Sequence, residues 1–418
     1  MAGLIAHAGK LVLRFGPTTA VLLLSQAVSA LSLFMLPLLG LRVSDVYAIA
    51  VQTGTGPYNG LVLGVIYLMV IGRPNFDRWK LVYFAVVAFA IVLTAYSLVS
   101  ALKRSADHAL PMGQTAWIVL LFGGGSIALG IASVRGVRQA CLGRPWLLAG
   151  VTMGPNLGMA LTTGALHFGF AGLAFAPVLP AAAWSLVAFV IAVVFVALPL
   201  PVNNAAQNKH APEPARNKFL HALGLVVGLV TSTILPIGFV TAAGNLSAGS
   251  ATVLFLANRI GSAIVGVFVN AVLMVRINWE DTERLYGRYS FAFPLISNLM
   301  VLAAALWNHL GGQQTISYAI VALAWLSLTS STPIVLREAN VRRLGSVIMT
   351  KALIDLAVSS LALLYFQRWP SATGYFGAAM ISQSITCIVC GWAFHDRRLV
   401  GVSLPGLALA ILLLIRGW

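Results

Sequence analysis

The stretch from Gly249 to Val275 reads GSATVLFLANRIGSAIVGVFVNAVLMV and carries one charged residue, Arg259. A membrane-spanning helix needs about 20 mostly apolar residues, so this run is long enough to cross a bilayer. An arginine near the centre of such a helix costs about 2.5–3.5 kcal/mol on insertion scales, and it needs a wet cavity, an acidic partner or an anionic ligand. Arg259 is therefore the first candidate for a substrate-binding residue. A side chain that reaches the membrane surface, or that pairs with one acid, is the alternative.

The whole chain has the composition of a membrane protein. Its 418 residues are 59% hydrophobic and only 9% charged, whereas soluble domains carry about 25% charged residues. We predict an all-α, polytopic membrane protein with about 12 transmembrane helices. The apolar runs cover residues 18–39, 46–71, 81–102, 114–133, 146–168, 177–200, 219–243, 249–275, 290–310, 316–336, 345–366 and 372–394. A shorter run at 401–415 is either a thirteenth span or an interfacial helix.

The basic residues indicate how the helices are oriented. With the N-terminus in the cytoplasm, 19 of the 26 Lys and Arg residues fall in inner loops and four in outer loops. Cytoplasmic loops are enriched in Lys and Arg, so this distribution supports the helix count and the orientation together. It also explains the net charge of +16, because the basic residues form no dense stripe of the kind that binds nucleic acid.

The two halves of the chain resemble each other. Gly64 and Gly266 lie in similar apolar runs and are 202 residues apart. Pro37 and Pro236 each follow a group of polar residues, and these two prolines are 199 residues apart. Two six-helix halves would insert the same way up, as parallel repeats related by a pseudo-two-fold axis, with a site between them near mid-membrane. Chance similarity among apolar helices is the alternative. The predicted parts are an N-terminal lobe (1–201), a cytoplasmic linker (202–217), a C-terminal lobe (218–395) and a tail with a short apolar helix (396–418).

Neutral polar residues accompany Arg259 in the predicted cavity. Such groups suit a sugar or a lipid headgroup, although Ser and Thr side chains also satisfy carbonyls that proline leaves free. Pro37 and Pro236 should kink their helices and act as hinges. Besides Arg259, the predicted cavity residues are Gln26, Gln52, Asn59, Thr231, Thr233, Asn258 and Asn270.

Three further charged residues are candidates for ion coupling or ion pairing. Lys351 and Asp355 are four residues apart in one predicted helix, so they share a face. They form either a self-neutralised pair or a site where Asp355 binds a proton or cation, or pairs with Arg259. Asp45 stands at the expected start of the helix 46–71, where it would cap free backbone N–H groups. A role for Asp45 in an outer gate is the alternative.

Motifs of enzymes are absent from the sequence. It has no HExxH, no Walker loop and no nucleophile elbow, so we expect no enzymatic activity, no cofactor, no metal and no ATP-driven pump. The three glycines at 123–125 lie inside a predicted helix, which favours close helix packing or a hinge over phosphate binding. Cys387 and Cys390 lie in an apolar run without further ligands, which predicts packing thiols and neither a zinc site nor a disulfide.

Residues 249–260, with Gly266 and an apolar run after them, resemble the helix 7–8 motif of the lipid II flippases. These belong to the multidrug/oligosaccharidyl-lipid/polysaccharide (MOP) exporter superfamily. Residues 44–47 resemble the start of that family's second helix. The resemblance implies that Arg259 is a cavity arginine that matters for function. The first helix is uncharged here and Asn258 replaces an acid, so the resemblance implies a divergent member that moves another lipid-linked sugar.

Such a member would be a flippase for a polyprenyl pyrophosphate-linked oligosaccharide or glycolipid precursor, used in cell-envelope polysaccharide synthesis. It would span the bacterial cytoplasmic membrane and work by alternating access. Arg259 would hold the pyrophosphate through charge-assisted hydrogen bonds. We expect a monomer whose partners are the lipid-linked sugar, the bilayer and H⁺, Na⁺ or the membrane potential. The alternatives are an ion-coupled exporter of small molecules or drugs from the same superfamily, and a non-transporting membrane scaffold.

Overall fold

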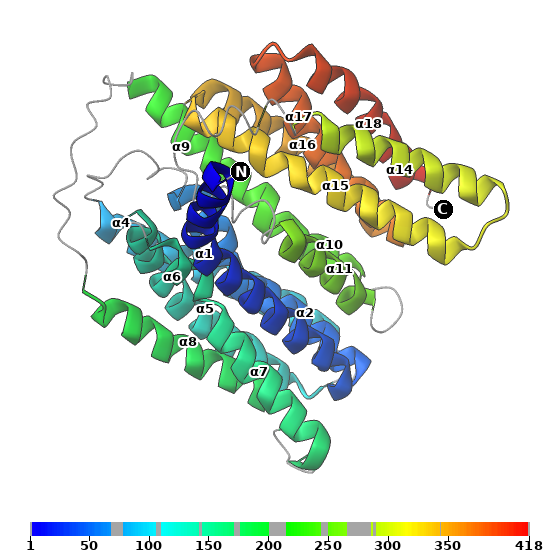
Figure 1. Ribbon diagram of the computed structural model, residues 1–418. Helices are drawn as coiled ribbons and strands as arrows, with labels where there is room; N and C mark the ends of the chain where they lie inside the picture. Colours follow the sequence, from blue (N-terminus) through cyan, green and yellow to red (C-terminus); the bar gives the residue numbers. More distant parts are fainter. Residues whose placement is uncertain are drawn as a thin grey trace. The chain divides into compact units, whose positions relative to one another are not determined.

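The structure is a computed structural model, and it describes most of the chain. The described residues are helical apart from short turns and contain no strand (Figure 1). Ten helices among them are long and apolar enough, by length and composition, to cross a membrane. The predicted all-α, polytopic class is confirmed. The described residues are 2–67, 78–105, 110–141, 144–170, 176–199, 215–243, 250–265, 286, 290–342 and 344–416.

Contacts between residues divide the chain into two compact units. The N-terminal unit comprises Met1–Lys209 and Gly244–Ala263, and the C-terminal unit comprises His210–Ala243 and Ile264–Trp418. The segment that carries Arg259 therefore belongs to the N-terminal unit, although it lies in the second half of the sequence. The predicted linker lies outside the described residues except for 215–217. The predicted lobe boundaries stay a prediction.

Helix α5 lies at the centre of the N-terminal unit. It packs against α2, α4 and α8, and α7 packs against both α1 and α8. Gly123 and Gly125 allow this approach, because a Cβ atom would lie 2.4 Å from Thr94 of α4 or 2.6 Å from Trp184 of α8. The expected role of these glycines in helix packing is thus confirmed. The elements of this unit are α1 (Ala2–Met35), η1 (Leu36–Leu39), α2 (Leu41–Gly56), η2 (Pro57–Tyr67), α4 (Trp79–Ser105), α5 (Met112–Cys141), α6 (Pro145–Gly150), α7 (Met153–Ala165), η3 (Leu166–Phe170), η4 (Ala176–Val178), α8 (Leu179–Ala197) and α11 (Ser250–Val265).

The connection between α1 and α2 differs from the sequence prediction. Pro37 lies in the 3₁₀ turn η1, so it ends α1 and does not bend the helix in its middle. Gly40 follows with φ = 106°, a left-handed value that favours glycine, and its N–H donates to Pro37 O at 3.0 Å. Helix α2 begins at Leu41, so Asp45 lies inside the helix. The prediction that Asp45 caps its own helix was wrong, because Gly40 is the residue that precedes the first turn.

The predicted span 146–168 is broken into two helices. A turn at Val151 and Thr152 separates α6 from α7. Pro155 explains the break, since it lacks an N–H and its ring crowds the carbonyl of Val151 four residues earlier. The hydroxyl of Thr152 meets that of Ser25 in α1 at 3.1 Å, which fixes the turn against α1.

The C-terminal unit is a bundle in which neighbouring helices pack in pairs. The closest associations join α14 with α15, α9 with α16, and α17 with α18. Helix α17 also packs against α15 and α16. The elements of this unit are α9 (Ala215–Leu229), η5 (Val230–Ile234), α10 (Leu235–Ala243), α14 (Ala292–His309), α15 (Gln314–Val341), α16 (Gly345–Arg368), α17 (Ala372–Ala393) and α18 (Arg397–Arg416).

Two prolines of this unit lie in or next to its helices. The π-helical turn η5 ends just before Pro236, at the point where the sequence predicts a bend. The hinge role of Pro37 and Pro236 stays a prediction. Pro405 lies inside α18, and Asn298 of α14 donates to Val402 O at 2.7 Å, three residues before the proline. Helix α18 is longer than the apolar run at 401–415 and is long and apolar enough to cross a membrane.

Candidate functional site

Arg259 lies on α11 and points toward α1 and α2. Its Nη2 atom donates a hydrogen bond to Thr55 Oγ1 in α2. Its guanidinium carbon lies 5.2 Å from the centre of the Phe255 ring, within the range of a cation–π interaction. Its Nε atom is buried and has no hydrogen-bond partner in the described part of the chain. The guanidinium therefore keeps a buried donor that no described residue satisfies.

Thr55 holds the guanidinium from α2. Its hydroxyl lies 3.2 Å from Val51 O and 3.3 Å from Gln52 O, so it donates to its own helix and accepts from Arg259. Thr55 is buried. It was not predicted as a site residue. The sequence could have indicated Thr55, because it lies three residues after the predicted residue Gln52 and so shares its helical face.

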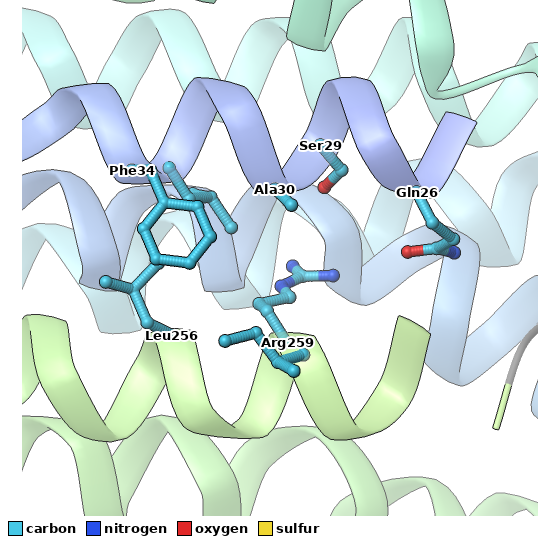
Figure 2. Close-up of a pocket in the computed structure, with 8 residues that line it drawn as sticks. Gln26, Ser29, Ala30, Phe34, Leu256 and Arg259 are labelled. Carbon is cyan, nitrogen blue, oxygen red and sulfur yellow. The ribbon is translucent and has the colours of Figure 1, made fainter. Parts of the chain in front are cut away.

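A small cavity separates Arg259 from α1. Its volume is about 10 Å³, which leaves room for one water molecule at most. Figure 2 shows the guanidinium between α11 and α1, with Ser29 and Gln26 on the opposite side. Ser29 was also missed by the sequence reasoning, although it follows the predicted residue Gln26 by three positions. The lining residues are Gln26, Ser29, Ala30, Leu33 and Phe34 from α1 and Leu256, Arg259 and Ile260 from α11.

Asp45 does not neutralise Arg259. Its Oδ1 atom accepts hydrogen bonds from the backbone N–H of Thr252 at 2.9 Å and from Thr252 Oγ1 at 2.8 Å. Thr252 precedes Arg259 by seven residues, about 10 Å along the helix axis. Among the described residues of the N-terminal unit, no carboxylate forms an ion pair with Arg259. Asp45 instead satisfies a free N–H in the first turn of α11.

Tyr47 forms hydrogen bonds at the start of α8, as Asp45 does at the start of α11. Its hydroxyl donates to Pro177 O at 2.5 Å and accepts from the N–H of Ala181 at 3.3 Å, in the first turn of α8. The Tyr47 ring is fully buried and contacts Phe122 edge to face. Residues 44–47, which carry part of the sequence resemblance, therefore hold the first turns of two other helices.

The other predicted cavity residues of the N-terminal unit do not line the small cavity beside Arg259. Gln52 and Asn258 are half-buried, Asn59 is exposed, and none of these side chains forms a hydrogen bond within the described ranges. Thr231 and Thr233 belong to the C-terminal unit, where their buried hydroxyls lack partners among the described residues. Asn270 and the Gly266 repeat position lie outside the described residues.

Lys351 and Asp355 form an ion pair within α16. Lys351 Nζ lies 2.9 Å from Asp355 Oδ2, and Ser359 Oγ donates to Asp355 Oδ1 at 3.0 Å. The Asp355 side chain is only 2% exposed. Both carboxylate oxygens are thus bonded to residues one turn away, and the spacing in the sequence predicted the first of these contacts, with Lys351. Whether this carboxylate couples transport to an ion stays a prediction.

The comparisons with known proteins identify the fold. No family model and no curated protein sequence matches the chain. The solved structure of the MATE multidrug transporter DinF-BH superposes with a TM-score of 0.58 at 13% identity, over 93% of this chain and 95% of that one. A second solved chain, described only as protein A, gives a TM-score of 0.57 at 12% identity over the same shares. The chain therefore has the fold of the solved MATE multidrug transporter.

Proposed function

We propose that this protein translocates a polyprenyl pyrophosphate-linked saccharide across the membrane. The observation that carries the proposal is the state of Arg259. It is a guanidinium inside an apolar helix with a buried, unpartnered Nε and no carboxylate partner among the described residues of its unit. An uncompensated buried cation is costly unless an anion or water balances it. A pyrophosphate supplies that balance through charge-assisted hydrogen bonds.

The neighbours of Arg259 suit the sugar part of such a substrate. Gln26 and Ser29 present an amide and a hydroxyl from α1, on the far side of the cavity (Figure 2). The cavity holds at most one water in this conformation, so α1 must move away from α11 before a headgroup can enter. Since α1 and the part of α11 that carries Arg259 belong to the same unit, this movement would be a rearrangement within the N-terminal unit that accompanies alternating access.

The first experiment is lipid extraction and mass spectrometry of cells depleted of the protein. We expect a polyprenyl-linked glycan to accumulate, and its mass would identify the sugar. The Arg259→Ala variant should reproduce the accumulation at a normal protein level, and Arg259→Lys should restore part of the flux because it keeps the charge. An Arg259→Ala protein with full activity would overturn the role of this residue.

Arg138 offers a matched control in the same unit. It also lies over an aromatic ring, with its guanidinium carbon 4.8 Å from the centre of the Trp79 ring, but it lies near the end of α5 and away from the cavity. Arg138→Ala should leave the lipid profile unchanged. If both arginine variants cause the same accumulation, a general loss of positive charge and not the loss of an anion site explains the defect.

Export of a small molecule is the second candidate function. The solved neighbour DinF-BH is described as a multidrug transporter, and the shared fold fits that activity equally well. In this case Asp355 or Asp45 would couple transport to an ion. Transport of a soluble compound that stops with an ionophore and with Asp355→Asn would favour this function. An unchanged lipid profile and the absence of such transport would leave a membrane scaffold.

A further inference from the structure

The connection between α17 and α18, residues 391–401, forms a tight elbow in the C-terminal unit. Helix α17 ends at Ala393 and α18 begins at Arg397. His395 has a left-handed backbone, with φ = 56°. The N–H of Asp396 donates to Gly391 O at 2.8 Å, which closes the turn. The elbow is thus held by its own backbone, and its shape does not depend on a ligand.

An open cavity lies on this elbow. Its volume is about 490 Å³, within the usual range of ligand pockets. Gly401 contributes to its openness, since a Cβ atom at that position would meet no atom within 4 Å. The lining residues are Gly391, Trp392, His395, Asp396, Arg397, Val400 and Gly401.

The charges around the cavity favour an anion. Arg397 and His395 are exposed, and neither side chain forms a hydrogen bond or ion pair within the described ranges. Asp396 also lines the cavity, but its carboxylate is already engaged. Its Oδ1 atom accepts from the N–H groups of Arg398 and Leu399, both at 3.1 Å.

The second oxygen of Asp396 is held by a buried phenol. Tyr286 donates its hydroxyl proton to Asp396 Oδ2 at 3.0 Å. Burial raises the pKa of Tyr286 above its usual value, so the hydroxyl keeps its proton across the physiological range. The carboxylate therefore serves as the cap of α18, and the free donors of the cavity belong to Arg397 and His395.

The position of the elbow indicates a membrane ligand. It joins two helices that are long and apolar enough to span, Thr373–Ala393 and Arg397–Ile415, so it lies where both reach the membrane surface. Trp392 is 76% exposed beside the cavity. Tryptophan concentrates at the level of lipid headgroups, where its ring meets acyl chains and its N–H meets polar groups.

We propose that the α17–α18 elbow binds the phosphate headgroup of an anionic phospholipid. Arg397 and His395 donate to the phosphate, and Trp392 packs along the start of the acyl chains. The sequence places this end of α17 on the cytoplasmic side, where basic pockets between transmembrane helices recognise anionic headgroups. The site lies in the C-terminal unit, whereas Arg259 lies in the N-terminal unit, so the proposal is independent of the transported substrate.

Native mass spectrometry of the full-length protein in a neutral detergent tests the proposal. The probes are phosphatidylglycerol and phosphatidylcholine with identical acyl chains, titrated separately. We expect phosphatidylglycerol to bind about fivefold more tightly. Arg397→Gln should remove most of this preference. Equal affinity for the two lipids, or an unchanged preference in Arg397→Gln, would overturn the site.

A variant that fills the cavity without changing any charge tests whether the lipid binds in the cavity itself. Gly401→Leu should fold normally, because the position is open and leucine favours a helix, yet it should block the lipid. Gly113→Leu is its matched control, since a Cβ atom there also meets nothing within 4 Å. Retained phosphatidylglycerol binding in Gly401→Leu would overturn the assignment to this cavity.

Two further tests ask whether binding is specific to this elbow and whether its phosphate belongs to a lipid. Arg368 and Trp369 form another exposed Arg–Trp pair at the far end of α16, with 5.4 Å between the guanidinium carbon and the ring centre. Arg368→Gln should not alter the preference for phosphatidylglycerol, and an equal loss there would indicate unspecific attraction. Inorganic phosphate should not displace the lipid at low millimolar concentration. Displacement would assign the cavity to a soluble phosphate and overturn the lipid site.

Discussion

The carboxylate of Asp45 in α2 accepts two hydrogen bonds from Thr252 in α11, a residue 207 positions later in the chain. One comes from the backbone N–H at 2.9 Å and one from the hydroxyl at 2.8 Å. The carboxylate satisfies a donor that the first turn of α11 leaves free, and its negative charge lies at the positive end of the helix dipole. This contact fixes the start of the helix that carries Arg259.

Loss of the Asp45 carboxylate should loosen α11. Asp45→Ala should cost about 1.5–3 kcal/mol of unfolding free energy, the usual range for hydrogen bonds to a charged group. Hydrogen–deuterium exchange of the peptide that contains Thr252 should become faster. Asp45→Asn keeps an acceptor oxygen and should show a smaller change. Exchange rates in Asp45→Ala that equal those of the wild type would show that the contact does not hold the helix.

Thr55 should be needed for the position of Arg259. Thr55→Val removes the hydroxyl that accepts from Nη2 and leaves a buried donor unsatisfied, which costs about 1–3 kcal/mol. We expect a lower thermal midpoint and reduced transport. Thr55→Ser restores the hydroxyl and should restore both. If Thr55→Val is as stable and as active as Thr55→Ser, the hydrogen bond between the two helices is unimportant.

The pair of Lys351 and Asp355 should be sensitive to the loss of one partner. Asp355→Leu leaves a mostly buried ammonium without its carboxylate, for which the expected cost is about 3–5 kcal/mol. The double variant Lys351→Met with Asp355→Leu should recover the stability, because apolar residues can replace a buried pair. Thermal unfolding of both variants in detergent measures this difference.

Transport by the same variants distinguishes a structural pair from a coupling site. A purely structural pair predicts that the double variant regains transport together with stability. A coupling carboxylate predicts a stable double variant that does not transport. The second result would support the ion-coupled exporter as the function.

Two glycines one turn apart in α9 should respond differently to alanine. At Gly224 a Cβ atom would lie 2.7 Å from the backbone nitrogen of Met349 in α16, so Gly224→Ala must push the two helices apart. At Gly228 a Cβ atom meets nothing within 4 Å. Gly228→Ala should be neutral or stabilising by up to about 1 kcal/mol, because alanine favours the helix. Equal thermal midpoints for the two variants would contradict the close contact between α9 and α16.

The sequence predicted the helices well because a membrane leaves few choices. Backbone groups in hydrocarbon must bond within their own segment, so each long apolar run becomes a helix. Helix geometry also predicted the ion pair of Lys351 and Asp355, since side chains four residues apart lie on the same face of a helix. Boundaries at irregular positions were less predictable. The start of α2 at Leu41 and the break before Pro155 depend on Gly40 and on one proline ring.

The candidate site was also predictable only in part. The sequence alone singled out Arg259, because a charge inside an apolar helix is costly wherever that helix packs. It also determined the all-α class and the positions of most of the spans, which follow from length and apolarity. Only the tertiary structure decided that Thr55 holds Arg259, that Ser29 faces it, and that Asp45 caps α11. These partners are separated by about half of the chain, and which helices meet depends on side-chain packing that no local pattern encodes.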